Sequence, residues 1–325
     1  MPFLYRPPVV VAAEVEFASS FTIGDYTAKL VKTMLINGNP AFGRLFERGG
    51  DAHPKPIHIT PLYVEQGGVL RSLYTRYVPK DRKRLEPPPR EVMKPVKIEG
   101  GRKYCFYVSV PLRLLPDVLK ALSNYGNFAF GQWEVRVRDI SFTIDYVDVE
   151  VRARSLVSQF EEIFNRKHDS PPAKLKVTFD TPALFKDPFV VGRWRKRHKL
   201  LVPLPDAVLD SPLYMVLLDR GVYRRSVYLK LLRYIKTVFS LPYTERGTAW
   251  LVWYCYNGSF FPALIGYTTY IVDGEAFGYA QAATNNRHGL DFMQLISEAI
   301  VLAEVYGVGD GRAAGFGHAF FSIKI

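Results

Sequence analysis

The order of secondary-structure signals in this chain of 325 residues is the same in its first and second halves. In each half the hydrophobic pattern predicts a strand, a helix, two strands, a second helix and a final strand. In the first half these elements are predicted at residues 9–17, 26–36, 57–64, 104–110, 115–125 and 133–147. In the second half they are predicted at residues 175–179, 213–239 (a helix with a break near Gly221), 290–306 and 317–325, with a hairpin within 247–272. This is the order of a ferredoxin-like (RRM-like) unit, so we expect an α+β fold of two such domains in tandem, with antiparallel sheets and helices on one face.

A polar segment with two prolines separates the two halves. Residues 166–172 read Arg-Lys-His-Asp-Ser-Pro-Pro, a composition typical of a linker. We therefore expect an N-terminal domain at 1–168 and a C-terminal domain with the glycine-rich loop at 172–325. Residues 67–102 are rich in proline and basic side chains and are expected to form a long excursion or an extended hairpin arm.

The chain is basic, with 43 Lys and Arg against 31 Asp and Glu, a formal charge of +12. This balance predicts an acidic partner: nucleic acid, an anionic membrane surface or a phosphorylated substrate. The two cysteines, Cys105 and Cys255, are too few for a disulfide framework or a four-cysteine zinc site. Histidines and cysteines show no metal-ligand spacing, so neither a metal site nor a cofactor is expected.

Neither a membrane span nor a signal peptide is expected. Residues 247–272 carry no charge, but Asn257-Gly258 is a turn signal in the middle of the run, so the pattern favours a hairpin. The apolar run at 9–13 is short, β-branched and closed by Glu14, which is typical of a strand. The expected compartment is the cytoplasm.

Residues 307–317 contain five glycines in eleven positions. Glycine allows positive φ and a close approach of backbone to ligand, and successive N–H groups can hold phosphate oxygens. The expected phosphate-binding residues are Gly307, Gly309, Gly311, Arg312, Gly315 and Gly317. The alternative is a connector whose glycines only cap and turn. A dinucleotide loop is disfavoured, because it would follow a strand and open a helix.

The helix, the glycine-rich loop and the terminal strand together resemble the C-terminal part of CRISPR-associated RNA-binding proteins of the RAMP superfamily, within it the pre-crRNA processing endoribonucleases. Three further features fit in the expected order: a strand that ends in Thr181-Pro182, a strand that contains Gly266, and a first helix that ends in Asn39-Pro40. The resemblance spans nearly the whole chain.

This resemblance implies a metal-independent endoribonuclease that cuts precursor CRISPR RNA within its repeats. In that reaction the 2′-hydroxyl attacks the adjacent phosphate, leaving a 2′,3′-cyclic phosphate and a 5′-hydroxyl. The chemistry needs a base, an acid and cations that stabilise the phosphorane.

In this family the catalytic residues lie on the first helix and in the loop after it. Here that region holds His53, a loop histidine able to act as base or acid near neutral pH. It also holds Lys29 and Lys32, which share one side of the predicted helix. We rank His53 first as a catalytic residue and the lysine pair next; the alternative for the lysines is a solvated helix face. His58 lies within a strand pattern and ranks lower.

A basic segment in the second half is the other candidate RNA-binding site. It holds Arg193, Trp194, Arg195, Lys196 and Arg197. The cations would neutralise phosphates, and the indole would stack on a base. The alternative is a solubilising loop.

Two other functions stay open at this stage. One is a non-catalytic repeat-RNA-binding subunit of a CRISPR effector complex, and the other is a general single-strand RNA binder. The expected partners are therefore the precursor CRISPR RNA, an effector complex and a second copy of the chain, with no membrane.

Overall fold

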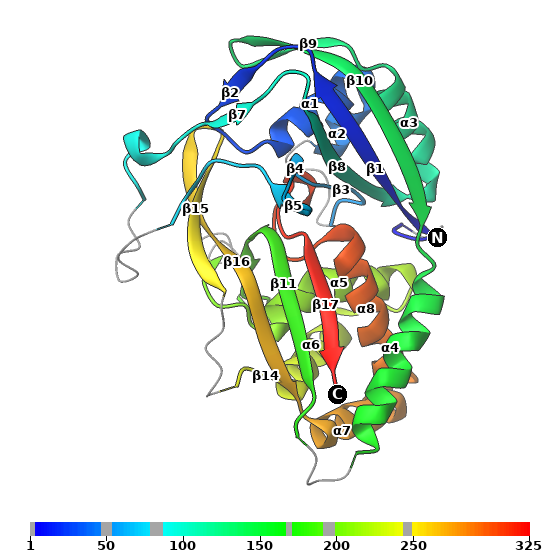
Figure 1. Ribbon diagram of the computed structural model, residues 1–325. Helices are drawn as coiled ribbons and strands as arrows, with labels where there is room; N and C mark the ends of the chain where they lie inside the picture. Colours follow the sequence, from blue (N-terminus) through cyan, green and yellow to red (C-terminus); the bar gives the residue numbers. More distant parts are fainter. Residues whose placement is uncertain (1–3, 47–53, 79–86, 167–170, 191–198, 243–248) are drawn as a thin grey trace.

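The computed structural model describes residues 4–46, 54–78, 87–166, 171–190, 199–242 and 249–325 (Figure 1). Two antiparallel sheets are its main β structure, one above the other in Figure 1. The prediction of an α+β fold with tandem ferredoxin-like units is confirmed.

The N-terminal sheet has the strand order β5-β4-β8-β1-β10-β9. These strands are β1 (Pro8–Phe17), β4 (Tyr63–Gln66), β5 (Val69–Ser72), β8 (Lys103–Pro111), β9 (Asn127–Phe130) and β10 (Trp133–Tyr146). A short strand, β3 (His58–Ile59), also pairs with β8, and β2 (Phe21–Ile23) pairs with β7 (Val96–Ile98). The helices of this part are α1 (Ala28–Gly38), α2 (Ala41–Phe46) and α3 (Leu115–Ser123).

The C-terminal sheet has the strand order β17-β11-β16-β15-β6. These strands are β6 (Arg76–Tyr77), β11 (Lys174–Ala183), β15 (Trp250–Tyr256), β16 (Ser259–Val272) and β17 (Ala319–Lys324), and β14 (Phe239–Ser240) pairs with β16. Its helices are α4 (Val149–Phe164), α5 (Pro205–Asp219), α6 (Arg225–Val238), α7 (Gly274–His288) and α8 (Phe292–Tyr306). Strand β6 comes from the predicted excursion at 67–102, so this segment joins the two sheets.

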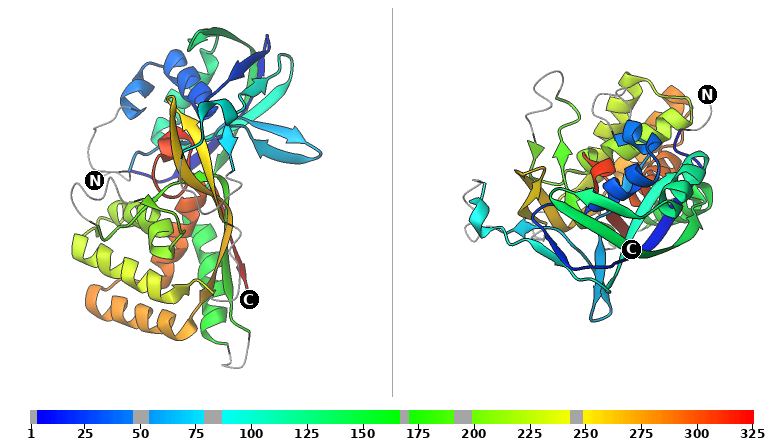
Figure 2. Two further views of the ribbon diagram at one scale, coloured as in Figure 1. Left: turned by 90° about the vertical axis from the view of Figure 1, so that its left-hand side faces the viewer. Right: turned by 90° about the horizontal axis from the view of Figure 1, so that it is seen from above.

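Helices cover one side of both sheets. Along β1, Val9, Val11 and Val15 are buried beneath α1 and α3, whereas the alternate residues Val10 and Glu14 face the other side. The left view of Figure 2 shows α1, α5, α6 and α7 on one side of the sheets and the β4–β5 hairpin projecting on the other. Each sheet therefore has an open face, as the period-two pattern of its strands requires.

The uncharged segment 247–272 is the β15–β16 hairpin, as predicted. Its turn residues Asn257 and Gly258 have φ of 52° and 69°, the conformation of a tight hairpin turn. None of the helices that the structure describes is long and apolar enough to cross a bilayer.

The helices agree only in part with the sequence-based expectation. Helices α2, α4 and α7 are not among the predicted elements. The break expected near Gly221 is present, because α5 ends before this residue and α6 begins after it.

The buried residues of α4 pack with the C-terminal helices. The helix precedes the boundary predicted at 168–172, and that boundary stays a prediction.

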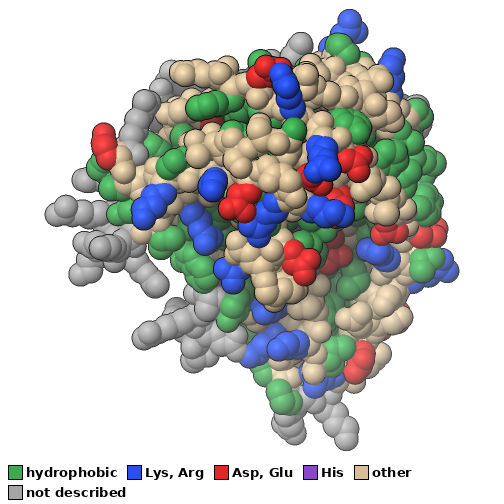
Figure 3. All heavy atoms as spheres, turned by 45° about the horizontal axis from the view of Figure 1, so that its top comes forward, with side chains coloured by type: hydrophobic (Ala, Val, Ile, Leu, Met, Phe, Trp, Pro, Cys, Tyr) green, Lys and Arg blue, Asp and Glu red, His purple; other side chains and the backbone are tan. Residues whose placement is uncertain are grey.

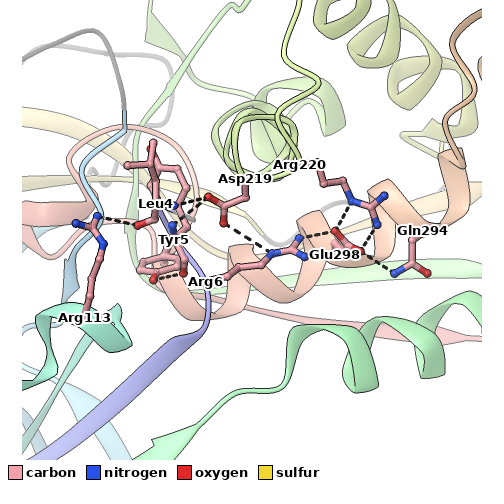
Figure 4. A network of polar contacts seen from close by, with 9 residues as sticks. Leu4, Tyr5, Arg6, Arg113, Asp219, Arg220, Gln294 and Glu298 are labelled. Atoms are coloured by element: carbon pink, nitrogen blue, oxygen red, sulfur yellow. Dashed lines mark hydrogen bonds and ion pairs between the residues drawn. The ribbon is translucent and has the colours of Figure 1, made fainter. Parts of the chain in front are cut away.

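The N-terminal segment is held against the C-terminal helices by a buried polar network (Figure 4). The Arg6 and Arg220 guanidinium groups both donate to the Glu298 carboxylate of α8, which is 1% exposed. Asp219 accepts from the amides of Leu4 (2.8 Å) and Tyr5 (3.1 Å). Burial would raise the pKa of Glu298, but the hydrogen bonds and charges of the two arginines hold it below its usual value.

Candidate functional site

The glycine-rich loop fits tightly between the end of β11 and the start of α1. Its five glycines all have φ between 68° and 93°. A Cβ at Gly309 would lie 2.2 Å from the Leu184 carbonyl oxygen, one at Gly315 2.4 Å from the Ala28 Cβ, and one at Gly317 2.0 Å from the Val308 carbonyl oxygen. Side chains are therefore excluded by both conformation and space.

Backbone hydrogen bonds hold this loop in place. The Asp310 amide donates to the Leu184 carbonyl (2.7 Å) and the Gly317 amide to the Pro182 carbonyl (3.0 Å). The amides of Gly309 and Gly311 form no hydrogen bond among the residues that the structure describes. Gly311 is exposed and Gly309 half-buried, so these two N–H groups are the part of the loop suited to a phosphate oxygen.

Arg312 does not lie on the loop surface. The residue is 6% exposed, its Nη1 donates to the Tyr306 carbonyl (3.1 Å), and burial lowers its pKa to about 10. The expectation that its guanidinium holds a phosphate is therefore wrong for this structure: the charge points into the core and ties the loop to the end of α8.

Two lysines of another element, the β12–β13 pair, lie near the tip of the glycine-rich loop. Strands β12 (Phe185–Lys186) and β13 (Lys199–Leu200) pair with Lys186 opposite Lys199. Lys186 forms an ion pair with Asp310 at the loop tip. Burial, and next to it repulsion from Lys186, lowers the pKa of Lys199.

The predicted basic segment, Arg193 to Arg197, lies outside the described residues. In the sequence it lies between β12 and β13.

Lys29, a predicted catalytic residue, lies at the edge of an aromatic cluster. Its Nζ is 2.7 Å from the Asp25 carboxylate and 5.9 Å from the centre of the Tyr256 ring. The same carboxylate accepts from the Asn257 amide in the β15–β16 turn (3.0 Å), so the hairpin positions the pair. Phe316 of the glycine-rich loop packs edge-on against Tyr256, 5.6 Å away.

The aromatic cluster extends from Lys29 on α1 to Lys199 on β13. Tyr254 packs against Phe316 (4.7 Å) and stacks on Phe261 (5.8 Å). Lys199 lies over the Phe261 ring, with its Nζ 4.7 Å from the centre. We call this region, made of Lys29, Lys186, Lys199, Asp310 and the loop tip, the glycine-loop surface.

The other two predicted catalytic residues are placed differently. Lys32, one turn along α1, lies over the Phe46 ring of α2 at 5.0 Å, not against the β15–β16 turn. His53 lies outside the described residues. It precedes Pro54, whose carbonyl accepts from the Tyr5 hydroxyl (2.7 Å).

A pair of stacked histidines, the buried His58 and the half-buried His318, adjoins the loop. His58 is fully buried, its Nδ1 is 3.0 Å from the Arg312 carbonyl, and its ring lies 5.6 Å from that of His318. Burial, and next to it His318, lowers the pKa of His58 well below its usual value, and burial lowers that of His318 to about 4. Both pKa shifts favour the neutral form of the imidazole rings.

Among the described residues, no group of three or more His, Cys, Asp or Glu side chains is arranged to hold a metal ion.

Comparison with known proteins identifies the fold. No protein family and no curated protein matches by sequence. Among solved structures, a Cas6 product complex has a TM-score of 0.55 at 15% identity, covering 97% of this chain and 100% of the other. A second structure, Thermus thermophilus Cas6, gives 0.52 at 15% identity, covering 97% and 98%.

The chain has the Cas6 fold.

The fold also occurs within a longer protein. A chain of a partial Cas6-RT-Cas1–Cas2 complex matches with a TM-score of 0.51 at 12% identity, covering 98% of this chain and 46% of that one. In this chain the glycine-rich loop contacts both the start of α1 and the β12–β13 pair.

Proposed function

We propose that this chain is a metal-independent endoribonuclease that cleaves precursor CRISPR RNA within its repeats. The observation that carries the proposal is the similarity to a Cas6 product complex over the full length of both chains. The glycine-loop surface supports it: exposed loop amides and the cations Lys29, Lys186 and Lys199 lie around one aromatic cluster.

The reaction proposed is attack of the 2′-hydroxyl on the adjacent phosphate. His53 takes the proton from this hydroxyl, and a cation stabilises the negative charge that develops on the phosphorane. Lys29 is suited to the second role, since Asp25 and the hairpin turn hold its ammonium group at the edge of the surface. As the bond from the 2′-oxygen to phosphorus forms, the P–O5′ bond breaks and the leaving 5′-oxygen takes up a proton from water, so the products are a 2′,3′-cyclic phosphate and a 5′-hydroxyl.

Cleavage of an end-labelled repeat RNA in EDTA tests the proposal. The wild type should make a single cut that leaves a cyclic phosphate. Loss of a general base or acid typically costs 10²–10⁴-fold in rate, so we expect about a 10²-fold or greater loss for His53→Ala. Lys29→Ala and Lys32→Ala are compared with Lys236→Ala, which changes an exposed lysine on α6. Cleavage that stops in EDTA would contradict the proposed mechanism.

A second function, that of a non-catalytic repeat-RNA-binding subunit, is favoured by one observation. The Lys29 ammonium is ion-paired with Asp25, and the neighbouring His58 is buried and neutral. Tight, salt-sensitive binding of the repeat with no product at any time would establish this function.

A further inference from the structure

The open face of the C-terminal sheet carries two exposed aromatic rings in one row, with β11 between them. In the register of the sheet, Thr178 of β11 lies opposite Tyr267 of β16 on one side and opposite Phe320 of β17 on the other. Tyr267 is 36% exposed and Phe320 51%. The rings stand two strands apart, about 10 Å at ordinary strand spacing. The two rings are therefore far enough apart to stack on separate bases.

Lysines occupy the next rows of the same face. Lys176, two residues before Thr178, holds its Nζ 4.3 Å from the centre of the Tyr267 ring. One row further, Lys174 lies opposite Lys324. Within the described stretches 174–178, 267–271 and 320–324 there is no acidic residue. The face is thus complementary to a polyanion with exposed aromatic bases.

Further rings continue this face toward the N-terminal sheet. The His318 ring packs edge-on against Phe320 (4.9 Å), and Tyr107 of β8 is parallel to His318 at 6.2 Å. The β4–β5 hairpin, with the exposed Arg71, projects on this same side of the sheets (Figure 2). A strand of nucleotides crossing the C-terminal sheet would therefore meet further aromatic and basic side chains.

We propose that this open face binds single-stranded RNA, with two bases stacked on Tyr267 and Phe320 and the backbone neutralised by Lys176 and Lys324. Stacking on aromatic side chains accepts every base, so the binding is not sequence-specific. Strand β17 begins two residues after Gly317, so the chain leads from the glycine-rich loop directly into this sheet. The inference rests on the proposed function only in taking RNA as the ligand.

The test measures the affinity of the full chain for a fluorescent ten-nucleotide oligouridine by anisotropy. Each stacked base is worth about 1–3 kcal/mol, so Phe320→Ala and Tyr267→Ala should each weaken binding about 5-fold or more. Phe320→Tyr and Tyr267→Phe should retain the affinity, because they keep the rings. Tyr279→Ala is the matched control, since this residue is 65% exposed on α7.

Cleavage of repeat RNA by the same variants separates the two proposals. If the wild type cleaves the repeat but the alanine variants bind oligouridine as tightly as Tyr279→Ala, the open-face site is wrong and the nuclease stands. If the wild type binds oligouridine through both rings but cleaves no repeat, the site stands and the nuclease is wrong. If the wild type binds neither RNA, both proposals fail.

Discussion

At the scale of single residues, Glu298 has the largest predicted effect on stability. Glu298→Gln leaves Arg6 and Arg220 without their common carboxylate in a buried place. Breaking such a pair typically costs 3–5 kcal/mol. We expect a loss of about 3 kcal/mol in the free energy of unfolding at pH 7, the lower end of this range. The reason is that the Arg220 side chain is 32% exposed. Urea unfolding of the variant and the wild type measures the difference.

The pH dependence of this difference has a defined sign. Because the pKa of folded Glu298 lies below its usual value, its stabilisation is complete above about pH 4.5 and is lost as the pH falls through the folded pKa. The gap between wild type and Glu298→Gln should therefore narrow in acid. Glu304→Gln is the control, because burial raises the pKa of Glu304 and its contribution has the opposite sign. A gap that stays constant down to pH 3 would contradict the ion-pair explanation.

The sequence predicted the role of a residue only where that role depends on backbone conformation, as for the loop glycines. Five closely spaced glycines indicate a loop with positive φ, and the structure has this conformation at all five. The orientation of Arg312 could not be predicted, since burial of its guanidinium depends on Tyr306 and on the packing of α8. The position of Lys29 could not be predicted either, because its ion-pair partner Asp25 also accepts a hydrogen bond from the amide of Asn257, which is far away in sequence.

At the scale of elements, the glycine-rich loop is predicted to be intolerant of side chains. Gly309→Ala adds a Cβ that clashes with the Leu184 carbonyl, at a φ of 68°. Gly101→Ala is the matched control, since its φ is 74° with no atom within 4 Å of the added Cβ. Strain alone costs about 1–2 kcal/mol, so Gly101→Ala should lose that much and Gly309→Ala clearly more, measured by urea unfolding. Equal losses would show that the loop yields to the clash.

Helices and strands with a long hydrophobic pattern were predicted well. Elements with a weak pattern, or that depend on pairing with a distant strand, were not predicted. The strand at β1 and the helix at α8 lie within two residues of their predicted positions, because both have long apolar patterns. Helix α7 buries only Phe277, Ala280 and Thr284, too few to produce a clear helical period. The two-residue strand β6 exists only through its pairing with β15, a contact that no local pattern carries.

At the scale of the whole molecule, the +12 charge attracts RNA but does not locate it. Figure 3 shows Lys and Arg interspersed with Asp and Glu over the drawn face, so specific contacts must decide where phosphates bind. The glycine-loop surface offers Lys186 and Lys199 opposite each other at the loop tip. These two lysines should therefore account for part of the salt dependence of repeat-RNA binding.

The contribution of Lys186 and Lys199 to the salt dependence of binding can be calculated from counterion release. Each phosphate contact with single-stranded RNA contributes about 0.7 to the slope of log affinity against log salt. The double variant Lys186→Gln/Lys199→Gln should lower the slope by about 1.4, whereas Lys236→Gln, on the exposed side of α6, should leave it unchanged. Titrations at several salt concentrations measure both slopes. If Lys236→Gln lowers the slope per charge as much as the double variant does, net charge holds the RNA and the glycine-loop surface has no special part in binding.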